Sequence, residues 1–542
     1  MSRKKLPSEH NVVYRAVDNW FCMSQRGTNI KTEIYAGLLM FLEIICMAAV
    51  SAQLIASNAY ISSYTTVYFG IMLVSAITTV LMGLVCNAPL IQSLSLAGVS
   101  LIVSTLSGYM GLTLANVLMI ALISNAIYLL VMLVPPLRRF FAGAVPAQVK
   151  KALPAAMGAY LLVYVLSQLG VFGVESHNYA SVLEKLAAAG DALPWWGLNT
   201  TTLSLDNISS LGWYASFAVI TCLAAFIFLA IFQARKRKHA VSLALLFAAL
   251  VYVALWVYRG NFMDYYYYAF ITPAYGGMYF YDSIPRISGE FNSSMLFKFL
   301  EGFNFTRYES YQKYLESKAT GVSMSDITLN VTPELILATV TSVLSFLALG
   351  VSETAAGIHA SAFAGNAYDE NGEIVYKSNP HLGKVGKYLN VYTVNALSSV
   401  IGCVIGGGPV MVRGESAVGV KEGGKTGLAA IVAGLLCVAS IFTVAFCGIF
   451  MNGAVVYGLL AFVALTLLMS FKNCDFTSAA DAMPFLLTVG AAALTQDLGI
   501  AVLLGIVLDT LTKLLSGKAK EIHAGSWIYS LLAVALIVLK NI

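Results

Sequence analysis

Runs of about twenty apolar residues recur along most of this chain, and they limit its fold more than any other feature. A helix needs about 20 mostly apolar residues to cross the hydrocarbon core of a bilayer. Hydrophobic residues occupy 58% of the 542 positions and charged residues only 11%, whereas a soluble domain averages about 25% charged residues. The sequence therefore predicts an all-α polytopic membrane protein. Its small net charge of +5 gives no reason to expect binding to nucleic acid.

The apolar runs predict fourteen transmembrane segments, of which the third and the tenth are interrupted. The twelve uninterrupted segments are expected at residues 33–56, 65–85, 114–134, 152–169, 213–232, 240–257, 333–351, 389–405, 428–450, 455–470, 483–494 and 498–515. A last apolar run, 527–539, is short for a span and is predicted to be an interfacial or packed helix.

Cationic residues cluster in the loops that share one side of the membrane when the N-terminus is cytoplasmic. These residues are Arg138, Arg139, Lys150, Lys151, Arg235, Lys236, Arg237, Lys238, Lys421, Lys425, Lys513, Lys518 and Lys520. Because the number of segments is even, both termini are expected to be cytoplasmic, in a multi-pass protein of the cell membrane.

The two interrupted segments have matching openings. Asn87-Ala88-Pro89 opens the third segment, and Gly407-Gly408-Pro409 opens the tenth, GGGPVMVRGESAVGVKEGGKTGL (406–428). Broken backbone at membrane depth is tolerated where it is buried in protein or lines a wet cavity. Interrupted segments at matching places in two halves indicate the binding site of a transporter. Since they lie seven segments apart, the sequence predicts a 7+7 inverted repeat.

Two glutamates are the leading candidates for binding a substrate. Glu415 follows the break and is predicted to lie near the start of a half-helix from about Ser416, whose amide groups and positive dipole end would face the cavity. Glu353 is predicted at the end of the eighth helix. Carboxylates accept hydrogen bonds from the N–H groups of a purine or pyrimidine. A buried carboxyl favours its protonated form, so one of the pair could carry a proton. The alternative is that each carboxylate caps a helix end.

Four stretches of this sequence resemble one family. ESAVGVKEGGKTGL (415–428) is similar to the ESASGVAEGGRTGL-type signature of the hypoxanthine/guanine/adenine permease subgroup in the nucleobase–cation symporter-2 family, which also holds the uracil and xanthine permeases. SETAAG (352–357) resembles the subgroup's DTAGT-type motif and the SEHIG-type motif of the uracil and xanthine permeases. RGTNIKTEIYAGLLMFL (26–42) and TKLLSGKAKEIHAGSWIYSLLAV (512–534) resemble its two terminal regions. The likeness spans nearly the whole chain.

The resemblance implies a core domain that moves against a gate domain, with the third and tenth segments crossing as short extended pieces whose amides contact the base. It also implies that homodimers can form, as they do in related branches. The expected parts are a cytoplasmic N-terminus (1–32), a core (33–134 and 331–450), a gate (149–257 and 455–515), an outer loop (258–330) and a C-terminal tail with a short apolar helix (516–542).

The resemblance further implies that Glu353 and Glu415 hold the base and that Glu353 is tied to proton coupling. Arg413-Gly414-Glu415-Ser416 resembles the GEN-type motif of the uracil and xanthine branch, so Gly414 and Ser416 are expected beside the base.

The third segment departs from the family. It reads SLSLAGVSL (93–101) where the family has roughly APGMGLNAF, so Ser93, Ser95 and Ala97 replace residues that approach the base.

Three further residues stand out near these motifs. Arg413 replaces part of a threonine-rich stretch. It could neutralise Glu415, favour an anionic ligand such as urate or xanthinate, or form a structural ion pair. Glu43 lies midway along the first helix, where the family has an uncharged residue, and could pair with Arg413 or form part of a proton path. His359 lies close to Glu353 in sequence and is a weaker candidate proton partner, the alternative being a solvated or capping group.

The sequence thus predicts a permease, not an enzyme, that takes up a nucleobase by proton symport through alternating access, with a purine favoured. No cofactor or metal is expected, and the partners are the base, the proton, the bilayer and a second copy of the chain. The alternative is an anion or carboxylate transporter of the same fold, which Arg413 favours and Glu353 and Glu415 oppose. A receptor or enzyme built on the outer loops lacks any catalytic constellation.

Overall fold

The structure is a computed structural model of the chain. It describes residues 12–56, 64–95, 98–99, 102, 114–169, 173–175, 200–202, 212–235, 240–258, 389–442, 453–474, 476, 478–495 and 498–539, together with scattered residues between 297 and 386.

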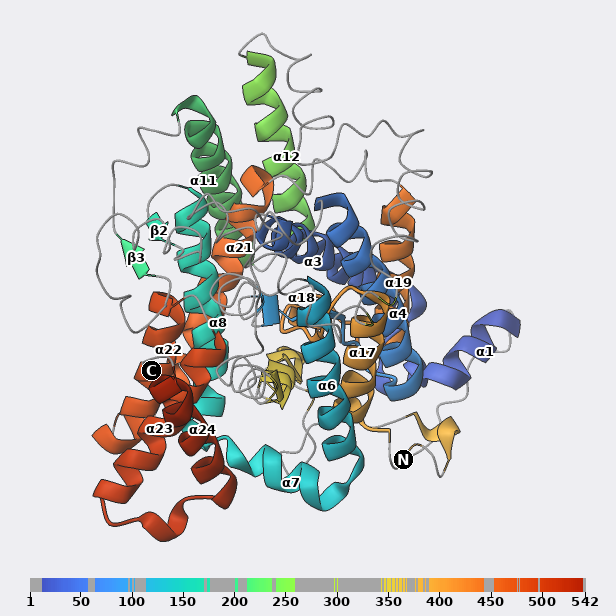
Figure 1. The fold of residues 1–542 in the computed structure, drawn as a ribbon. Coiled ribbons are helices and arrows are strands. Elements are labelled where there is room, and N and C mark those ends of the chain that lie inside the picture. The colour runs from blue at the N-terminus through green and yellow to red at the C-terminus, as the bar shows by residue number, and fades with distance from the viewer. Residues whose placement is uncertain are drawn as a thin grey trace, which may run out of the picture.

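The described residues are mainly helical, and most of the long helices pack in two groups (Figure 1). The first group contains α3 (Ile30–Ala56), α4 (Tyr64–Cys86), α6 (Leu114–Leu133), α17 (Val391–Ile405), α18 (Ser416–Lys421) and α19 (Gly427–Phe442). The second group contains α8 (Ala147–Gln168), α11 (Gly212–Ala234), α12 (Ala240–Tyr258), α21 (Gly453–Leu468), α22 (Ala479–Thr495), α23 (Leu498–Leu515) and α24 (Ala524–Leu539). Helix α7 (Pro135–Ala144) links them, and α1 (Val12–Phe21) and α2 (Met23–Arg26) precede the first group.

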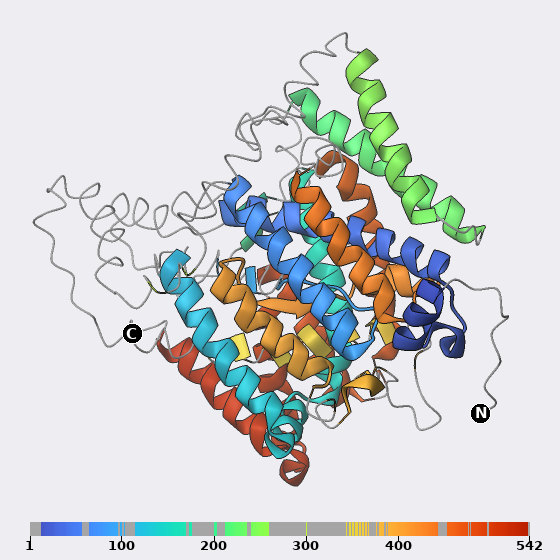
Figure 2. The same ribbon diagram turned by 90° about the vertical axis from the view of Figure 1, so that its right-hand side faces the viewer.

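Within the first group, α19, α4, α17 and α6 lie side by side (Figure 2). Helices α4 and α19 cross very closely, because a side chain at Gly427 would collide with the backbone carbonyl of Gly83. At a neighbouring crossing, a side chain at Gly37 would collide with the carbonyl of Ala429 on α19. Small residues at such crossings let membrane helices approach until their backbones touch.

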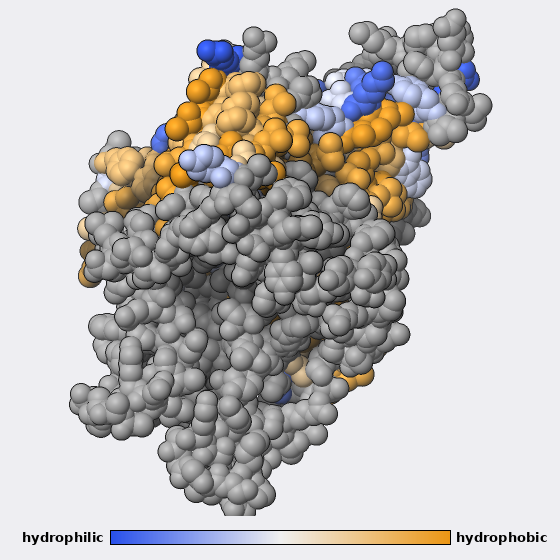
Figure 3. Space-filling model, turned by 90° about the horizontal axis from the view of Figure 1, so that it is seen from above, coloured by the Kyte–Doolittle hydropathy of each residue, from blue (hydrophilic) through white to orange (hydrophobic). Residues whose placement is uncertain are grey.

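Several helices have the length and apolarity of membrane spans. Among the described residues, Val67–Cys86, Ala115–Leu133 and Ala147–Ser167 are long and apolar enough to cross a bilayer, and further apolar helices are shorter. Leucines on these and neighbouring helices are more than half exposed, namely Leu130, Leu223, Leu250, Leu435 and Leu494. Hydrophobic residues also gather in broad patches on the face seen from above (Figure 3). Contiguous apolar surface of this kind is typical of contact with lipid.

Both interrupted segments contain a short strand, and the two strands pair with each other. Strand β1 (Gln92–Leu94) runs antiparallel to β4 (Val410–Val412), with Ser93 opposite Met411. Strand β1 packs on α4, and β4 packs on α17. The expected crossing of the third and tenth segments as extended pieces is thus confirmed. A second small pair, β2 (Gly173–Glu175) with β3 (Thr200–Thr202), lies apart from it.

Two expectations about helix ends are wrong. The described residues between 343 and 365 are helical, so Glu353 lies inside the eighth helix and not at its end. This helix continues because its later residues are buried against β4, where a side chain at Gly357 would collide with the Val412 carbonyl. Helix α8 begins at Ala147 and not at 152, with Pro154 inside it.

The C-terminal apolar run forms α24, which packs on α23 and α7 as a packed helix should. The hydroxyl of Ser526 donates to the Ala144 carbonyl at 2.7 Å, and that of Ser530 donates to Thr510 at 3.0 Å.

Candidate functional site

The strand pair rests on a polar stripe of α17. Asn395 and Ser398 both hydrogen-bond the side chain of Gln92 at 2.8 Å, and Asn395 also donates to the Thr354 hydroxyl at 2.8 Å. All four residues are buried. Ser399 on the same stripe hydrogen-bonds the backbone of Val410. These bonds fix both strands to α17 and to the helix that carries Glu353.

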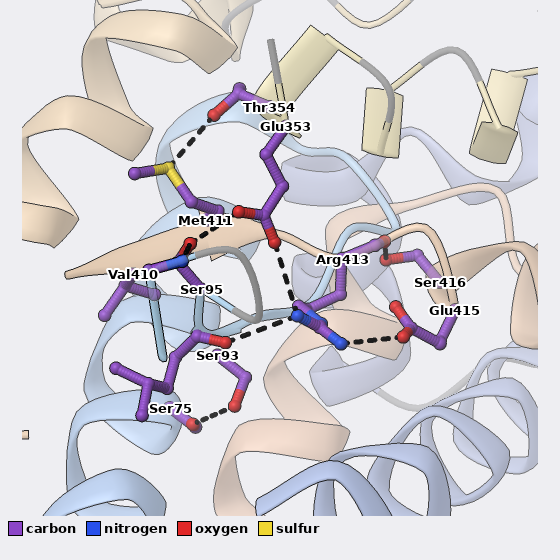
Figure 4. A network of polar contacts seen from close by, with 12 residues as sticks. Ser75, Ser93, Ser95, Glu353, Thr354, Val410, Met411, Arg413, Glu415 and Ser416 are labelled. Atoms are coloured by element: carbon purple, nitrogen blue, oxygen red, sulfur yellow. Dashed lines mark hydrogen bonds and ion pairs between the residues drawn. The ribbon is translucent and has the colours of Figure 1, made fainter. Parts of the chain in front are cut away.

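Arg413 follows β4 and bridges the two glutamates that the sequence singled out (Figure 4). Its Nη2 donates to Oε1 of Glu415 at 2.7 Å, and its Nη1 lies 3.4 Å from Oε1 of Glu353. The same Nη1 also donates to the backbone carbonyl of Leu94 at 3.3 Å. Arg413 is only 2% exposed, and both glutamates are buried. The three charged side chains therefore form one buried network in which two acids share one cation.

Two serines complete the surroundings of the network. The hydroxyl of Ser95 donates to Oε2 of Glu353 at 2.5 Å and accepts the Gly98 amide at 2.7 Å. The hydroxyl of Ser416 donates to the Arg413 carbonyl at 2.6 Å and accepts the Ile91 amide at 3.0 Å. Both oxygens of Glu353 thus have a partner within this network.

Four buried side-chain atoms, from three residues of this region, lack hydrogen-bond partners among the described residues. They are Nε of Arg413, Oε2 of Glu415 and both carboxylate oxygens of Glu43. Glu43 on α3 is 1% exposed and lies within electrostatic range of Glu415 and Arg413. Leaving buried polar groups unpaired costs about 1–3 kcal/mol each, and more for charged groups. Such groups are typical of a site that binds something else.

The start of α18 does not present free amides, contrary to the expectation from sequence. The amides of Ser416, Ala417 and Val418 already donate to the carbonyls of residues 413, 414 and 415. Helix α18 is only six residues long, and Glu415 is its N-cap residue without a side-chain cap bond. The functional groups here are side chains and not helix-terminal amides.

The chain is similar in sequence to several permeases. No protein-family model matches the chain. The chain is 22% identical over 527 residues to guanine/hypoxanthine permease GhxP of Escherichia coli O157:H7, and the match covers 96% of both proteins. It is 26% identical over 188 residues to adenine permease AdeP of Escherichia coli K12, covering 34% of this chain and 42% of that one. It is 22% identical over 531 residues to a putative permease of Haemophilus influenzae, covering 96% and 98%.

The chain is thus similar to permeases named for guanine, hypoxanthine and adenine, and in the first case along nearly its whole length. Among solved structures, the chain resembles the transmembrane domain of a cyanobacterial bicarbonate transporter, BicA. The TM-score is 0.50 at 11% sequence identity, and the match covers 88% of this chain and 97% of that one. At this identity the likeness concerns the fold alone.

The structure brings most of the predicted site residues together. Glu353, Glu415, Arg413, Ser95 and Ser416 form one connected network, with Glu43 in electrostatic range.

Other predicted residues lie at the edge of this network or cannot be placed. Ser93 points away from Arg413 and accepts a hydrogen bond from Ser75 at 2.9 Å. At Gly414, an added side chain would meet Ala360 only at ordinary contact distance. Ala97 and His359 lie outside the described residues.

Sequence reasoning did not identify the stripe on α17. Asn395, Ser398 and Ser399 follow an i, i+3, i+4 pattern inside an apolar helix, and this pattern places them on one face. That signal was available in the sequence. The buried Tyr160 of α8, in the second helix group, also lies within electrostatic range of Arg413, and no sequence pattern marked it. Within the described part of the chain, no cluster of side chains could hold a metal ion.

Proposed function

We propose that this protein is a secondary transporter that takes up a purine nucleobase together with a proton by alternating access. One observation carries the proposal. A chain similar along its whole length to a guanine/hypoxanthine permease brings two carboxylates and an arginine to the crossing of its two interrupted segments.

The chemistry of this site suits a purine base. Carboxylates accept hydrogen bonds from ring and exocyclic N–H groups, and a guanidinium only donates. A purine edge carries such N–H groups beside ring nitrogen or carbonyl acceptors, so Glu415 and Arg413 can serve adjacent atoms of one base. The proposed base-binding residues are Glu353, Glu415, Ser93, Ser95, Ala97, Gly414 and Ser416, with Arg413 as the electrostatic partner. The proposed proton-coupling residues are Glu353, Glu43 and His359.

The two helix groups are the proposed moving parts. The group around β1 and β4 is the core, and the group around α8, α21 and α22 is the gate. Tyr160 belongs to the gate and lies close enough to Arg413 of the core to interact with it electrostatically. This proximity supports a binding site at the boundary between core and gate. We place fourteen segments in a 7+7 inverted repeat, with both termini cytoplasmic and with dimerisation through a second copy. The boundaries of core, gate, outer loop and tails are those expected from the sequence.

Anion transport on the same fold is the competing proposal, and Arg413 is the residue that favours it. Within the network, however, Arg413 is held by two carboxylates, so the described site carries more negative than positive charge. Such a site repels an inorganic anion and attracts a neutral ligand rich in N–H groups.

Uptake by proteoliposomes tests the proposal. Radiolabelled hypoxanthine and, separately, bicarbonate are supplied to wild-type protein and to Glu415→Gln, with and without an inward proton gradient. Saturable hypoxanthine uptake that the gradient drives and that Glu415→Gln abolishes is the expected result. Folded wild-type protein that takes up bicarbonate but no purine would refute the proposal and favour the anion transporter.

A further inference from the structure

Glu43 is the acidic residue of this region that the network leaves out. It lies on α3, and neither of its carboxylate oxygens has a hydrogen-bond partner among the described residues. Helices α4 and α19, which pack against α3, contain no charged residue, and neither does β1. The charge on α18, Lys421, is exposed and bonds Gln233 at 3.2 Å. Among the described residues, the charged groups that face Glu43 are therefore Glu415 and Arg413.

Two of the three guanidinium nitrogens of Arg413 already have hydrogen-bond acceptors. Nη2 is held by Glu415, and Nη1 is held by Glu353 and the Leu94 carbonyl. Nε has no partner among the described residues, and neither does Oε2 of Glu415. One donor and one acceptor are thus left within the same ion pair. A purine base carries an N–H group beside an acceptor, and it can satisfy both.

Of the proton-coupling candidates named above, Glu353 is less well placed than Glu43 to exchange a proton in this arrangement. Ser95 donates to one of its oxygens, and Arg413 lies against the other. Hydrogen bonds and a nearby cation both favour the charged form of a carboxylate. Among the described residues, Glu43 has no hydrogen-bond donor and no cation within ion-pair distance, and an isolated buried carboxylate is strongly unfavourable. If Glu43 loses its proton, the new negative charge must therefore be met by a rearrangement of the charged groups that face it, Arg413 and Glu415.

We propose that Glu43 is the proton-coupling carboxyl and that, when ionised, it competes with the base for Arg413. The inference rests on the proposed function and assigns the coupling step within it. With a proton on Glu43, Arg413 stays with Glu353 and Glu415 and offers Nε–H to the base. When that proton leaves to water, the Glu43 carboxylate attracts Arg413 and repels Glu415, so the base loses both partners. No bond within the base changes.

This competition couples the proton and the base in the same direction, as symport requires. The base binds well only when Glu43 is protonated, so the proton and the base are loaded together on the outer side. Loss of the proton to the cytoplasm weakens the hold on the base and releases it there. By linkage, the base must raise the proton affinity of Glu43 by the same factor by which the proton raises the affinity for the base.

The test measures hypoxanthine binding from pH 5 to pH 8 and transport in proteoliposomes, for wild type, Glu43→Gln and Glu43→Asp. Wild-type affinity should fall towards about tenfold per pH unit once Glu43 ionises, the limit for one linked proton. Glu43→Gln should bind with a flat pH profile and keep hypoxanthine counterflow, but it should lose gradient-driven accumulation. Glu43→Asp should restore a pH slope. Glu521→Gln, at an exposed position in a 3-10 turn, is the matched control and should behave as wild type.

Each outcome decides the question. A Glu43→Gln protein that keeps the wild-type pH slope and accumulation would overturn the inference and leave purine transport intact. A wild-type protein that neither binds nor moves hypoxanthine would overturn the proposed function itself. If Glu43→Gln does not fold, infrared difference spectra of wild type and Glu43→Asp decide. Hypoxanthine should then produce a protonated-carboxyl band that shifts in Glu43→Asp, and an unshifted band would contradict the role of Glu43.

Discussion

Helix α3 carries two buried glutamates that the protein treats in opposite ways. Glu33 accepts the backbone amides of Lys425, Thr426 and Ala429 at 2.9, 3.4 and 3.3 Å. Glu43, further along the same helix, has no hydrogen-bond partner among the described residues. The two side chains have the same chemistry and nearly the same exposure, 0% and 1%. Burial alone therefore does not distinguish these two acids of α3, whereas hydrogen-bond satisfaction does.

The contacts around Glu33 show what the N-terminal motif (26–42) does in the structure. Arg26 donates to the carbonyls of Asn87 and Lys425 at 2.7 and 2.8 Å, and the Asn87 side chain accepts the Gly427 amide at 2.9 Å. The N-terminal motif and the end of the tenth-segment motif thus meet in one junction. These bonds of Arg26, Glu33 and Asn87 all join a side chain to the backbone, which is typical of a junction that holds loops in place.

The largest effect is expected from Arg413→Met. Removing the cation leaves two buried carboxylates facing each other, and losing one partner of a buried ion pair costs about 3–5 kcal/mol of folding free energy. Hypoxanthine binding should be lost as well. Denaturant unfolding in detergent and hypoxanthine titration measure both effects. As a control, Arg413→Met combined with Glu353→Gln and Glu415→Gln should recover most of the stability without recovering binding. A stable single variant would contradict the network.

Glu33→Ala should have the next largest effect, and it should act on stability alone. Three backbone amides lose their acceptor, and hydrogen bonds to a charged group contribute about 1.5–3 kcal/mol each when they are well formed. Because two of the three are long, a total loss of about 2–4 kcal/mol is expected. The matched variant Glu43→Leu should leave the unfolding free energy within about 1 kcal/mol of wild type, since it removes unsatisfied polar atoms. Equal losses in the two variants would break the comparison.

Asn395→Leu should disturb the site indirectly, through the hydrogen bonds by which α17 holds β1 and Thr354. It removes the partner of the Gln92 amide and of the Thr354 hydroxyl, and each unsatisfied buried group costs about 1–3 kcal/mol. Since Gln92 belongs to β1, we expect hypoxanthine affinity to fall several-fold while its pH dependence stays unchanged. Titrations at two pH values measure this. Unchanged affinity in the folded variant would show that α17 does not position the strands.

Asp509→Asn should have the smallest effect. Asp509 pairs with Lys513 at 2.7 Å on α23, where the lysine side chain is 27% exposed. A partly exposed pair of this kind contributes about 0–1 kcal/mol. Thermal unfolding and uptake should both stay close to wild type. A large loss of uptake would show that this ion pair takes part in transport.

Much of the fold follows from the sequence, because long apolar runs and broken segments have direct physical meaning. The paired openings at Pro89 and Pro409 predicted two interrupted segments, the resemblance implied that these segments cross as extended pieces, and the pairing of strands β1 and β4 confirms the crossing. The extent of the helix around Glu353 was not predictable from hydropathy, because Thr354 and Glu353 are polar and their partners come from distant segments. Helix α7 was also missed, since the arginines inside it suggested a loop.

The candidate site was predictable in its residues but not in its connections. The sequence singled out Glu353, Glu415 and Arg413 and left open which acid Arg413 would meet. The structure has Arg413 between both of these acids, a result that depends on the antiparallel register of the strands and on the depth of the eighth helix. Neither the register nor the depth of the helix can be predicted from a local sequence pattern.

The most direct test of the account is an experimental structure of the protein with hypoxanthine bound at pH 5. The base should lie beside β1 and β4, within hydrogen-bond distance of Arg413 Nε and of Oε2 of Glu415. Glu43 should then remain unpaired with Arg413. A base bound away from the strand crossing, or Arg413 paired with Glu43 while the base is present, would contradict it.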